Sequence, residues 1–178
     1  MKFILVLFFI GQSVFSQQYF TKNGLTHFMA SEESFVPVTA KNNNTKAILT
    51  HKGAIAAQVY INEFDFKIGL MQEHFNENYM DSDTHPKATF KGNLSVKDLS
   101  NIKISQEVTI TGTLTIKGVE KQIITKATLS KKDKGFYLIS SFSVKPQDFA
   151  IKIPSIVRKK IAQEVFVNLA YTFLPKEN

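Results

Sequence analysis

The segment Leu70–Gly92, "LMQEHFNENYMDSDTHPKATFKG", gathers many of the side chains in this sequence that could do chemistry. Its acidic residues and histidines are Glu73, His74, Glu77, Asp81, Asp83 and His85. Two carboxylates held close together can act as general acid and general base, and histidine beside a carboxylate can bind a metal ion. Large apolar side chains lie between these polar groups, so the same segment could instead cover a binding site for an apolar ligand.

The spacing of these polar groups argues against catalysis and against a metal site. Glu73 and Glu77 are four residues apart, so a helix would place both on one side, where water normally solvates carboxylates. The four histidines are well separated, and neither His-x-His nor His-Glu-x-x-His occurs. The sequence also lacks Gly-x-Ser-x-Gly, Gly-x-Gly-x-x-Gly, a glycine-rich phosphate loop and any cysteine. We therefore expect no catalytic residue, no metal ion and no cofactor, and a protein that is not an enzyme.

The first half of the segment is expected to be helical over residues 71–80, because apolar side chains recur there at three- and four-residue spacings. They form a stripe of Leu70, Met71, His74, Phe75, Tyr79 and Met80. Methionine suits a surface that adapts to a lipid chain. The stripe predicts either a lid over a ligand cavity or a plug in one end of a barrel. A second short helix is expected in residues 154–164, with Pro154 in its first turn.

The rest of the chain shows the two-residue period of β-strands. In "EVTITGTLTIKG", Val108, Ile110, Leu114 and Ile116 alternate with threonines. Turn sequences follow at "KGVE" and "KKDKG", so this strand and the next two form an antiparallel meander. Similar patterns predict about eight strands, in residues 25–31, 47–53, 54–66, 87–96, 107–118, 121–130, 136–144 and 164–174.

Many short strands with little helix predict an all-β sandwich or barrel. A closed barrel of about eight strands either fills its interior with side chains or holds one small ligand. Periodicity alone does not separate these outcomes, and the 16 phenylalanines could do either. Gly112 lies on the inward phase of its strand, which favours a bend or a cavity at that level.

The N-terminus predicts export from the cytoplasm. A basic start, the apolar run "FILVLFFI" and small residues up to Ser16 are typical of a signal peptide, residues 1–16. Residues 17–178 are then expected to form one domain with a net charge of +6, since removal of Lys2 lowers the charge of +7. The cations are scattered lysines with a single arginine, which argues against a nucleic-acid partner. They permit a transient contact with a membrane surface.

Three motifs resemble the YceI-like family. They are the helix with its strand entry at Phe75–Phe90, the hairpin "TGTLTIKGVEKQI" at Thr111–Ile123, and "KPQDFAIKIP" at Lys145–Pro154. Their order and spacing are similar to those of the family, over roughly residues 54–173. The chain has Ala150 where the family has a glycine.

The resemblance implies a lipocalin-like antiparallel barrel in the periplasm, with one helix near its mouth. Inside it would bind, transport or store a long amphiphilic lipid, either a polyisoprenoid or a lipid that resembles an isoprenoid quinone. A homodimer is also implied. The ligand-binding residues would be Phe64, Phe66, Leu70, Met71, His74, Phe75, Asn78, Tyr79, Phe90, Ile110, Leu114, Ile116, Phe142 and Phe149. The polar head would lie near the rim, at His74, Asn78 or a lysine. Two alternatives remain: a filled barrel that acts through its surface in envelope stress response, and a lipid-modifying enzyme.

Overall fold

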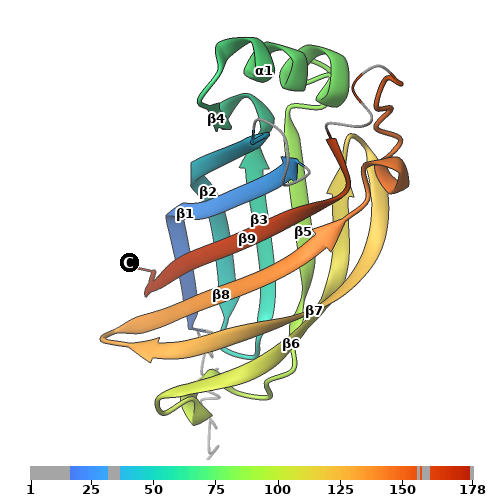
Figure 1. Ribbon diagram of the computed structural model, residues 1–178. Helices are drawn as coiled ribbons and strands as arrows, with labels where there is room; N and C mark the ends of the chain where they lie inside the picture. The colour runs from blue at the N-terminus through green and yellow to red at the C-terminus, as the bar shows by residue number, and fades with distance from the viewer. Residues whose placement is uncertain (1–16, 32–36, 156, 158–160, 177–178) are drawn as a thin grey trace, which may run out of the picture.

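The computed structural model describes residues 17–31, 37–155, 157 and 161–176, and within them eight strands close into an antiparallel barrel (Figure 1). The predicted signal peptide lies outside these residues. Neighbours around the ring run β1, β9, β8, β7, β6, β5, β3, β2, and β2 pairs again with β1. The strands are β1 Gln18–Ser31, β2 Thr39–Thr50, β3 Ala54–Tyr60, β5 Lys87–Leu94, β6 Ser105–Ile116, β7 Val119–Lys132, β8 Gly135–Val144 and β9 Ile161–Pro175. The all-β class expected from periodicity and the lipocalin-like barrel implied by the resemblance are both confirmed.

The strand predicted over residues 54–66 is interrupted. After β3, the chain makes a short 3-10 turn, η1 (Ile61–Glu63), and then the two-residue strand β4 (Asp65–Phe66). β4 returns to β2, where Phe66 pairs with Ala40. β3 and β4 therefore lie along the same side of β2, and the break between them lets the chain turn toward the helix.

The turns of the predicted meander differ in how they reverse the chain. β6 and β7 are joined by Lys117 and Gly118, which both have positive φ, the geometry of a two-residue hairpin turn. Between β7 and β8 the positive φ belongs to Asp133. Gly135 instead allows a close approach, because a Cβ there would collide with the backbone of Phe173 on β9.

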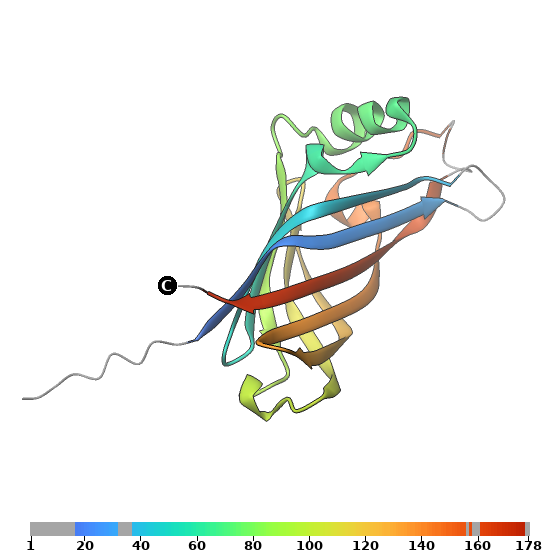
Figure 2. The same cartoon turned by 90° about the vertical axis from the view of Figure 1, so that its left-hand side faces the viewer.

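The predicted helix is present and extends over residues 69–80 (Figure 2). Its first half, α1 (Gly69–His74), is α-helical, and its second half, η2 (Phe75–Met80), is wound as a π-helix. Asp81, at φ 50°, ends it in the left-handed region. Figures 1 and 2 both place it across one end of the barrel. None of the helices in the described part of the chain is long and apolar enough to cross a membrane.

The second predicted helix is wrong in its last part, because residues 161–164 begin β9. Residues 156 and 158–160 lie outside the described part. Two other short 3-10 turns are η3 (Leu99–Asn101), between β5 and β6, and η4 (Pro146–Phe149), after β8.

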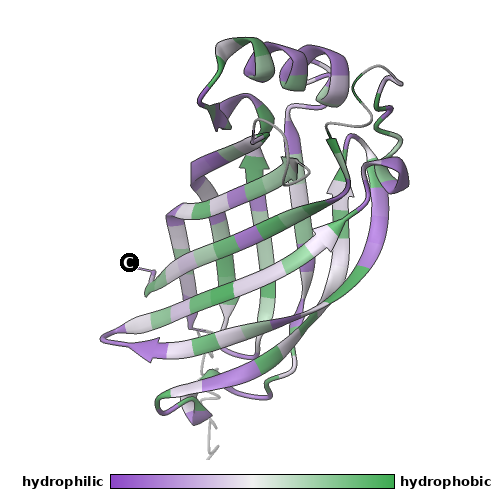
Figure 3. Ribbon diagram, in the orientation of Figure 1, coloured by the Kyte–Doolittle hydropathy of each residue, from purple (hydrophilic) through white to green (hydrophobic). Residues whose placement is uncertain are grey.

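Apolar residues alternate along the strands (Figure 3), and those that point inward form two clusters. The filled half of the barrel is a large cluster whose most buried members include Leu49, Leu129, Phe136 and Phe173. η3 closes this half, since Leu99 is fully buried in it. The open half is a smaller cluster around Phe28, Val59, Phe64 and Phe66, on the side of the helix. Side chains therefore fill the interior at one end of the barrel and form only its inner wall at the other.

Candidate functional site

A cavity of about 580 Å³ occupies the open half, between the helix and the filled half. Its lining is almost wholly apolar. Thirteen of the fourteen residues predicted to bind ligand lie on it: Phe64, Phe66, Leu70, Met71, His74, Phe75, Tyr79, Phe90, Ile110, Leu114, Ile116, Phe142 and Phe149. The exception is Asn78, which is exposed on the helix and does not line the cavity. The structure therefore brings together residues from the helix, from η4 and from strands distant in sequence.

Other lining residues were missed in the sequence. The main ones are Thr26 and Phe28 on β1, Thr45 on β2, Val59 on β3, Leu169 and Tyr171 on β9, and Ile151, Ile153 and Val157 in the segment before β9. The strand residues lie on inward phases and could have been found by extending the two-residue period along β1 and β9. The segment before β9 carries no such period, so only the fold places it at the cavity.

Four phenylalanine rings anchor the helix to the barrel wall. Phe75 of the helix lies 5.1 Å from Phe66, 5.4 Å from Phe28 and 5.7 Å from Phe64, measured between ring centroids. These distances and tilted arrangements are those of favourable aromatic pairs, each worth about 0.5–1.5 kcal/mol beyond area burial. Phe75 thus fixes the helix over the cavity while the helix keeps its acidic residues, Glu73 and Glu77, exposed.

The end of the helix is also tied to the β6–β7 turn. Lys117 donates a hydrogen bond from Nζ to the backbone oxygen of Tyr79, at 2.8 Å. At the start of the helix, by contrast, Ile68 and Leu70 are 42% and 59% exposed although both line the cavity. Ile153, in the segment before β9, is half-buried and also lines the cavity. These apolar residues, at once on the surface and on the cavity wall, form the rim of its mouth.

The floor of the cavity is the boundary with the filled half. Ile55, Ile110, Leu138 and Tyr171 belong to the packed cluster and also line the cavity. Gly112 does not open space at this level, as its inward phase had suggested. It pairs with Gly92 across β5 and β6, and a Cβ on Gly112 would lie 2.6 Å from Cζ of Phe90. The ring of Phe90 therefore covers both glycines and becomes part of the wall.

Three hydroxyl groups meet in the buried wall of the cavity. Oγ1 of Thr26 lies 2.7 Å from Oγ1 of Thr45 and 3.0 Å from the hydroxyl oxygen of Tyr171. Burial raises the pKa of Tyr171 to about 12, so its phenol is neutral at physiological pH. The register of β1 shifts at Gly24, as it does at a β-bulge. The absence of a side chain at Gly24 makes room for the tyrosine ring, because a Cβ there would lie 2.5 Å from Cδ1 of Tyr171.

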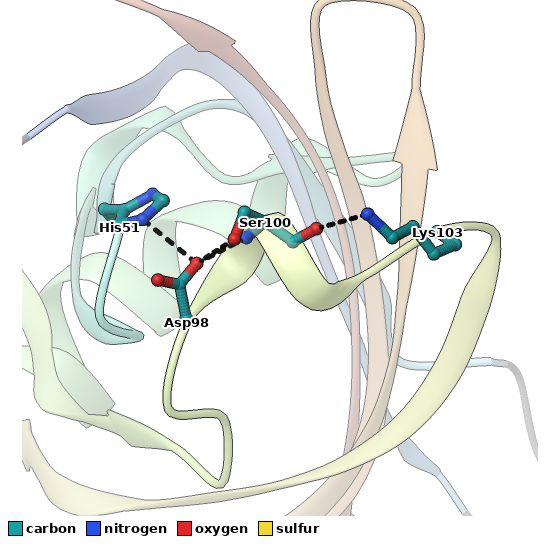
Figure 4. Close-up of polar contacts among 4 residues, drawn as sticks. All are labelled: His51, Asp98, Ser100 and Lys103. Carbon is teal, nitrogen blue, oxygen red and sulfur yellow. Dashed lines mark hydrogen bonds and ion pairs between the residues drawn. The ribbon is translucent and has the colours of Figure 1, made fainter.

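His51, Asp98 and Ser100 form a polar cluster at the other end of the barrel (Figure 4). They are the residue types of a catalytic triad, but they are not arranged as one. Oδ1 of Asp98 lies 3.0 Å from Nε2 of His51 and accepts hydrogen bonds from the backbone nitrogen and the hydroxyl of Ser100. The carboxylate thus lies between serine and histidine, whereas a nucleophilic triad needs the histidine in the middle. Asp98 caps η3, and Leu99 donates its backbone N–H to the oxygen of His51. This cluster closes the base of the barrel.

The described residues offer no arrangement suited to a metal ion, since no three or more histidine and acidic side chains converge among them. Among the described residues of the cavity lining, the one basic side chain is His74, at the mouth. The described lining therefore suits a mainly apolar ligand.

A family model described as the YceI-like domain matches residues 18–173. No curated protein matches the chain. Solved structures do match, at low sequence identity.

A polyisoprenoid-binding domain from Saccharophagus degradans, implicated in plant cell wall breakdown, is 14% identical with a TM-score of 0.78, and the match covers 90% of this chain and 99% of that one. BcnA of Burkholderia cenocepacia is 16% identical with a TM-score of 0.70, over 84% and 95% of the two chains. The YCEI protein of Campylobacter jejuni is 15% identical with a TM-score of 0.65, over 83% and 90%. At these identities the likeness is one of fold.

Proposed function

This chain belongs to the YceI-like domain family, and from that premise we propose that it binds the apolar tail of a long amphiphilic lipid inside its barrel. The ligand would be a polyisoprenoid or a lipid that resembles an isoprenoid quinone. The observation that carries the proposal is the apolar cavity of about 580 Å³, which reaches the surface at an apolar rim. A volume of this size falls within the roughly 300–1,000 Å³ usual for small-ligand sites.

The physical basis of binding would be the hydrophobic effect. Each methylene-sized group that moves from water into the cavity contributes about 0.8 kcal/mol. The cavity is already present in the structure, where Phe75 of the helix packs against the rings of Phe64 and Phe66 in its wall. A lipid tail that is insoluble in water is thereby made transportable.

Ligand exchange would take place through the rim at the start of the helix. Ile68 and Leu70 are exposed apolar side chains beside the mouth, and such residues can enter the surface of a bilayer. We propose transient contact of this rim with a membrane, and export of residues 17–178 to the periplasm after removal of residues 1–16. Membrane contact and a periplasmic location together would allow the protein to carry or store lipid between membranes. A homodimer stays a prediction.

Lipid extraction and native mass spectrometry test the proposal. The protein, purified from the periplasm of its own host without harsh detergent, should carry an isoprenoid lipid of defined mass. The matched control is Leu114→Trp, which places a bulky ring on the cavity wall without touching the packed half. The wild type should yield the lipid, and Leu114→Trp should yield much less. A wild type that is empty, and that takes up no added isoprenoid, would contradict the proposal.

The same experiment addresses the two alternatives. A barrel that acts only through its surface would carry no lipid and would tolerate Leu114→Trp in a functional assay of the host envelope. A lipid-modifying enzyme would release a changed lipid, and this activity would be lost on changing Glu73 or His74 while lipid binding persisted. Both alternatives predict outcomes that differ from stable co-purification of an unmodified lipid.

A further inference from the structure

The hydroxyl groups of Thr26, Thr45 and Tyr171 differ from the other buried polar groups of the barrel. The side chain of Asn42 donates to the backbone oxygen of Tyr60, and Ser140 donates to the backbone oxygen of Lys126. The three hydroxyls, in contrast, bond within the described residues only to one another. Most buried side-chain hydroxyls bond to backbone or water. Hydroxyls that line a cavity and bond only to one another are therefore expected to bind a further partner.

Counting hydrogens shows what that partner would be. Three hydroxyls supply three donors, and the two short contacts, Thr26 to Thr45 and Thr26 to Tyr171, use two of them. Either oxygen of each contact could be the donor, and one of the three hydroxyl hydrogens stays free in every case. If Thr45 donates to Thr26 and Thr26 donates to Tyr171, the phenol hydrogen is left free for an acceptor in the cavity. A chain of this kind also strengthens its terminal donor.

The charge of the partner is limited by its surroundings. The described lining contains one basic side chain, His74, and that residue is at the mouth, on the helix. The three hydroxyls lie instead where the cavity meets the filled half, since Tyr171 belongs to both. A phosphate or carboxylate there would lose its hydration without gaining a cation, which is costly. A neutral carbonyl oxygen would lose far less and would gain the phenol.

We propose that the hydroxyls of Thr26, Thr45 and Tyr171 form a binding subsite at the cavity floor for a neutral carbonyl oxygen of the ligand. This inference rests on the proposed function and assigns the end of the lipid that lies at the floor: the end that bears a ketone, quinone or similar carbonyl group. The ligand enters with its carbonyl end first, and its tail extends toward the helix and the mouth. This orientation is the reverse of a head group bound at the rim by His74.

The test compares three probes with the same farnesyl tail: farnesylacetone, which has a ketone, the hydrocarbon in which the carbonyl of farnesylacetone is replaced by a methylene, and farnesyl diphosphate. Each is delivered from cyclodextrin to the full mature chain, and its Kd is measured by competition. The ketone should bind about tenfold more tightly than the hydrocarbon, the effect expected of one added hydrogen bond in a buried site. Tyr171→Phe should abolish this preference while leaving the hydrocarbon affinity unchanged.

Two other tyrosines provide matched controls. Tyr79→Phe removes a hydroxyl from the helix that covers the cavity, and Tyr19→Phe removes one from the packed half, away from the cavity. Both should keep the ketone preference. The carbonyl stretching frequency of bound farnesylacetone provides a measurement that needs no variant. It should be lower in the wild-type complex than in a hydrocarbon solvent. Thr26→Val should weaken the preference if Tyr171→Phe does not fold.

Several outcomes would overturn the inference while preserving lipid binding. They are equal ketone and hydrocarbon affinity in the wild type, an unshifted carbonyl frequency, or a ketone preference that survives Tyr171→Phe and is lost with Tyr79→Phe. Tightest binding of the diphosphate, with dependence on His74, would place the head at the mouth and would also overturn it. If none of the three probes binds, the proposed function fails and this inference fails with it.

Discussion

The two halves of the barrel are built from the same kinds of strand, but one half is packed with side chains and the other encloses a cavity. In the filled half, Leu49, Leu129 and Phe173 have no exposed surface, and η3 closes the end. In the open half, Phe142 and Leu114 point inward from the same strands that supply the filled half, yet they face a cavity and remain half-buried. One continuous sheet therefore combines a core that stabilises the fold with a cavity that can receive a ligand.

The difference shows how a small barrel can hold a cavity without disulfides. The chain has no cysteine, so the filled half must supply the cohesion that the open half lacks. The open half keeps its shape through a few directed contacts, mainly the four-phenylalanine cluster and the hydrogen bond from Lys117 to the helix end. Substitutions should therefore affect stability at one end and binding at the other.

Truncation of a buried ring should show the largest difference between the halves. We expect Phe173→Ala, in the filled half, to lower the free energy of unfolding by about 3–5 kcal/mol, because it leaves a cavity in close-packed surroundings. Phe142→Ala, on the cavity wall, should cost clearly less, since the ring already has space on one side. Chemical denaturation of both variants measures this. Equal losses of unfolding free energy in the two variants would mean that the two halves are packed equally tightly.

Enlargement of a side chain should lower stability in the filled half and weaken ligand binding in the open half. Leu129→Trp overpacks the filled half and should lower stability by about 1–3 kcal/mol. Leu114→Trp should leave stability nearly unchanged, because the new ring enters the cavity. It should weaken binding of an isoprenoid probe by roughly tenfold, equivalent to about 1.4 kcal/mol. A Leu114→Trp variant that unfolds as readily as Leu129→Trp would show that the cavity cannot accept a side chain.

A substitution at the end of η4 should stabilise the protein. Ala150 ends η4 at φ 55°, a left-handed conformation that costs residues other than glycine about 1–2 kcal/mol. Ala150→Gly should therefore raise the free energy of unfolding by up to about 1 kcal/mol, after allowance for the greater freedom of glycine in the unfolded chain. Ala170→Gly, within β9, is the control and should destabilise. Loss of stability in Ala150→Gly would show that φ is not what limits this turn.

The smallest effect is expected at the base of the filled half. Hydrogen bonds from Ser100, with a smaller contribution from His51, lower the pKa of Asp98 below its ordinary value of 3.8. Its contribution to stability is therefore complete above pH 3.8 and is lost as the pH falls through the lowered folded-state pKa. Asp98→Asn should remove this part of the acid dependence, while Asp83→Asn, at the other end, should not. Unfolding curves from pH 7 to pH 2 compare them, and identical acid profiles for Asp98→Asn and the wild type would contradict the assignment.

Much of the cavity wall could be predicted because strand phase is a local property. Ile110, Leu114 and Ile116 were placed on one face from alternation alone, and all three line the cavity. Asn78, which the resemblance implied as a ligand residue, does not line the cavity, and it lies in the second half of the helix, which is wound as a π-helix with a wider turn. The hydroxyl cluster was missed because its members are 19 and 145 residues apart in sequence, and no periodic pattern joins them.

The sequence by itself determined the all-β class, the approximate number of strands and the face that each residue presents, because these follow from propensity and a two-residue period within each strand. Only the tertiary structure decided that the interior is half packed and half open. That outcome depends on where side chains from distant strands meet, as when Phe90 fills the space above Gly92 and Gly112, or when the ring of Tyr171 enters the bulge at Gly24. Close packing is a property of the assembled barrel, and a linear pattern carries too little information to specify it.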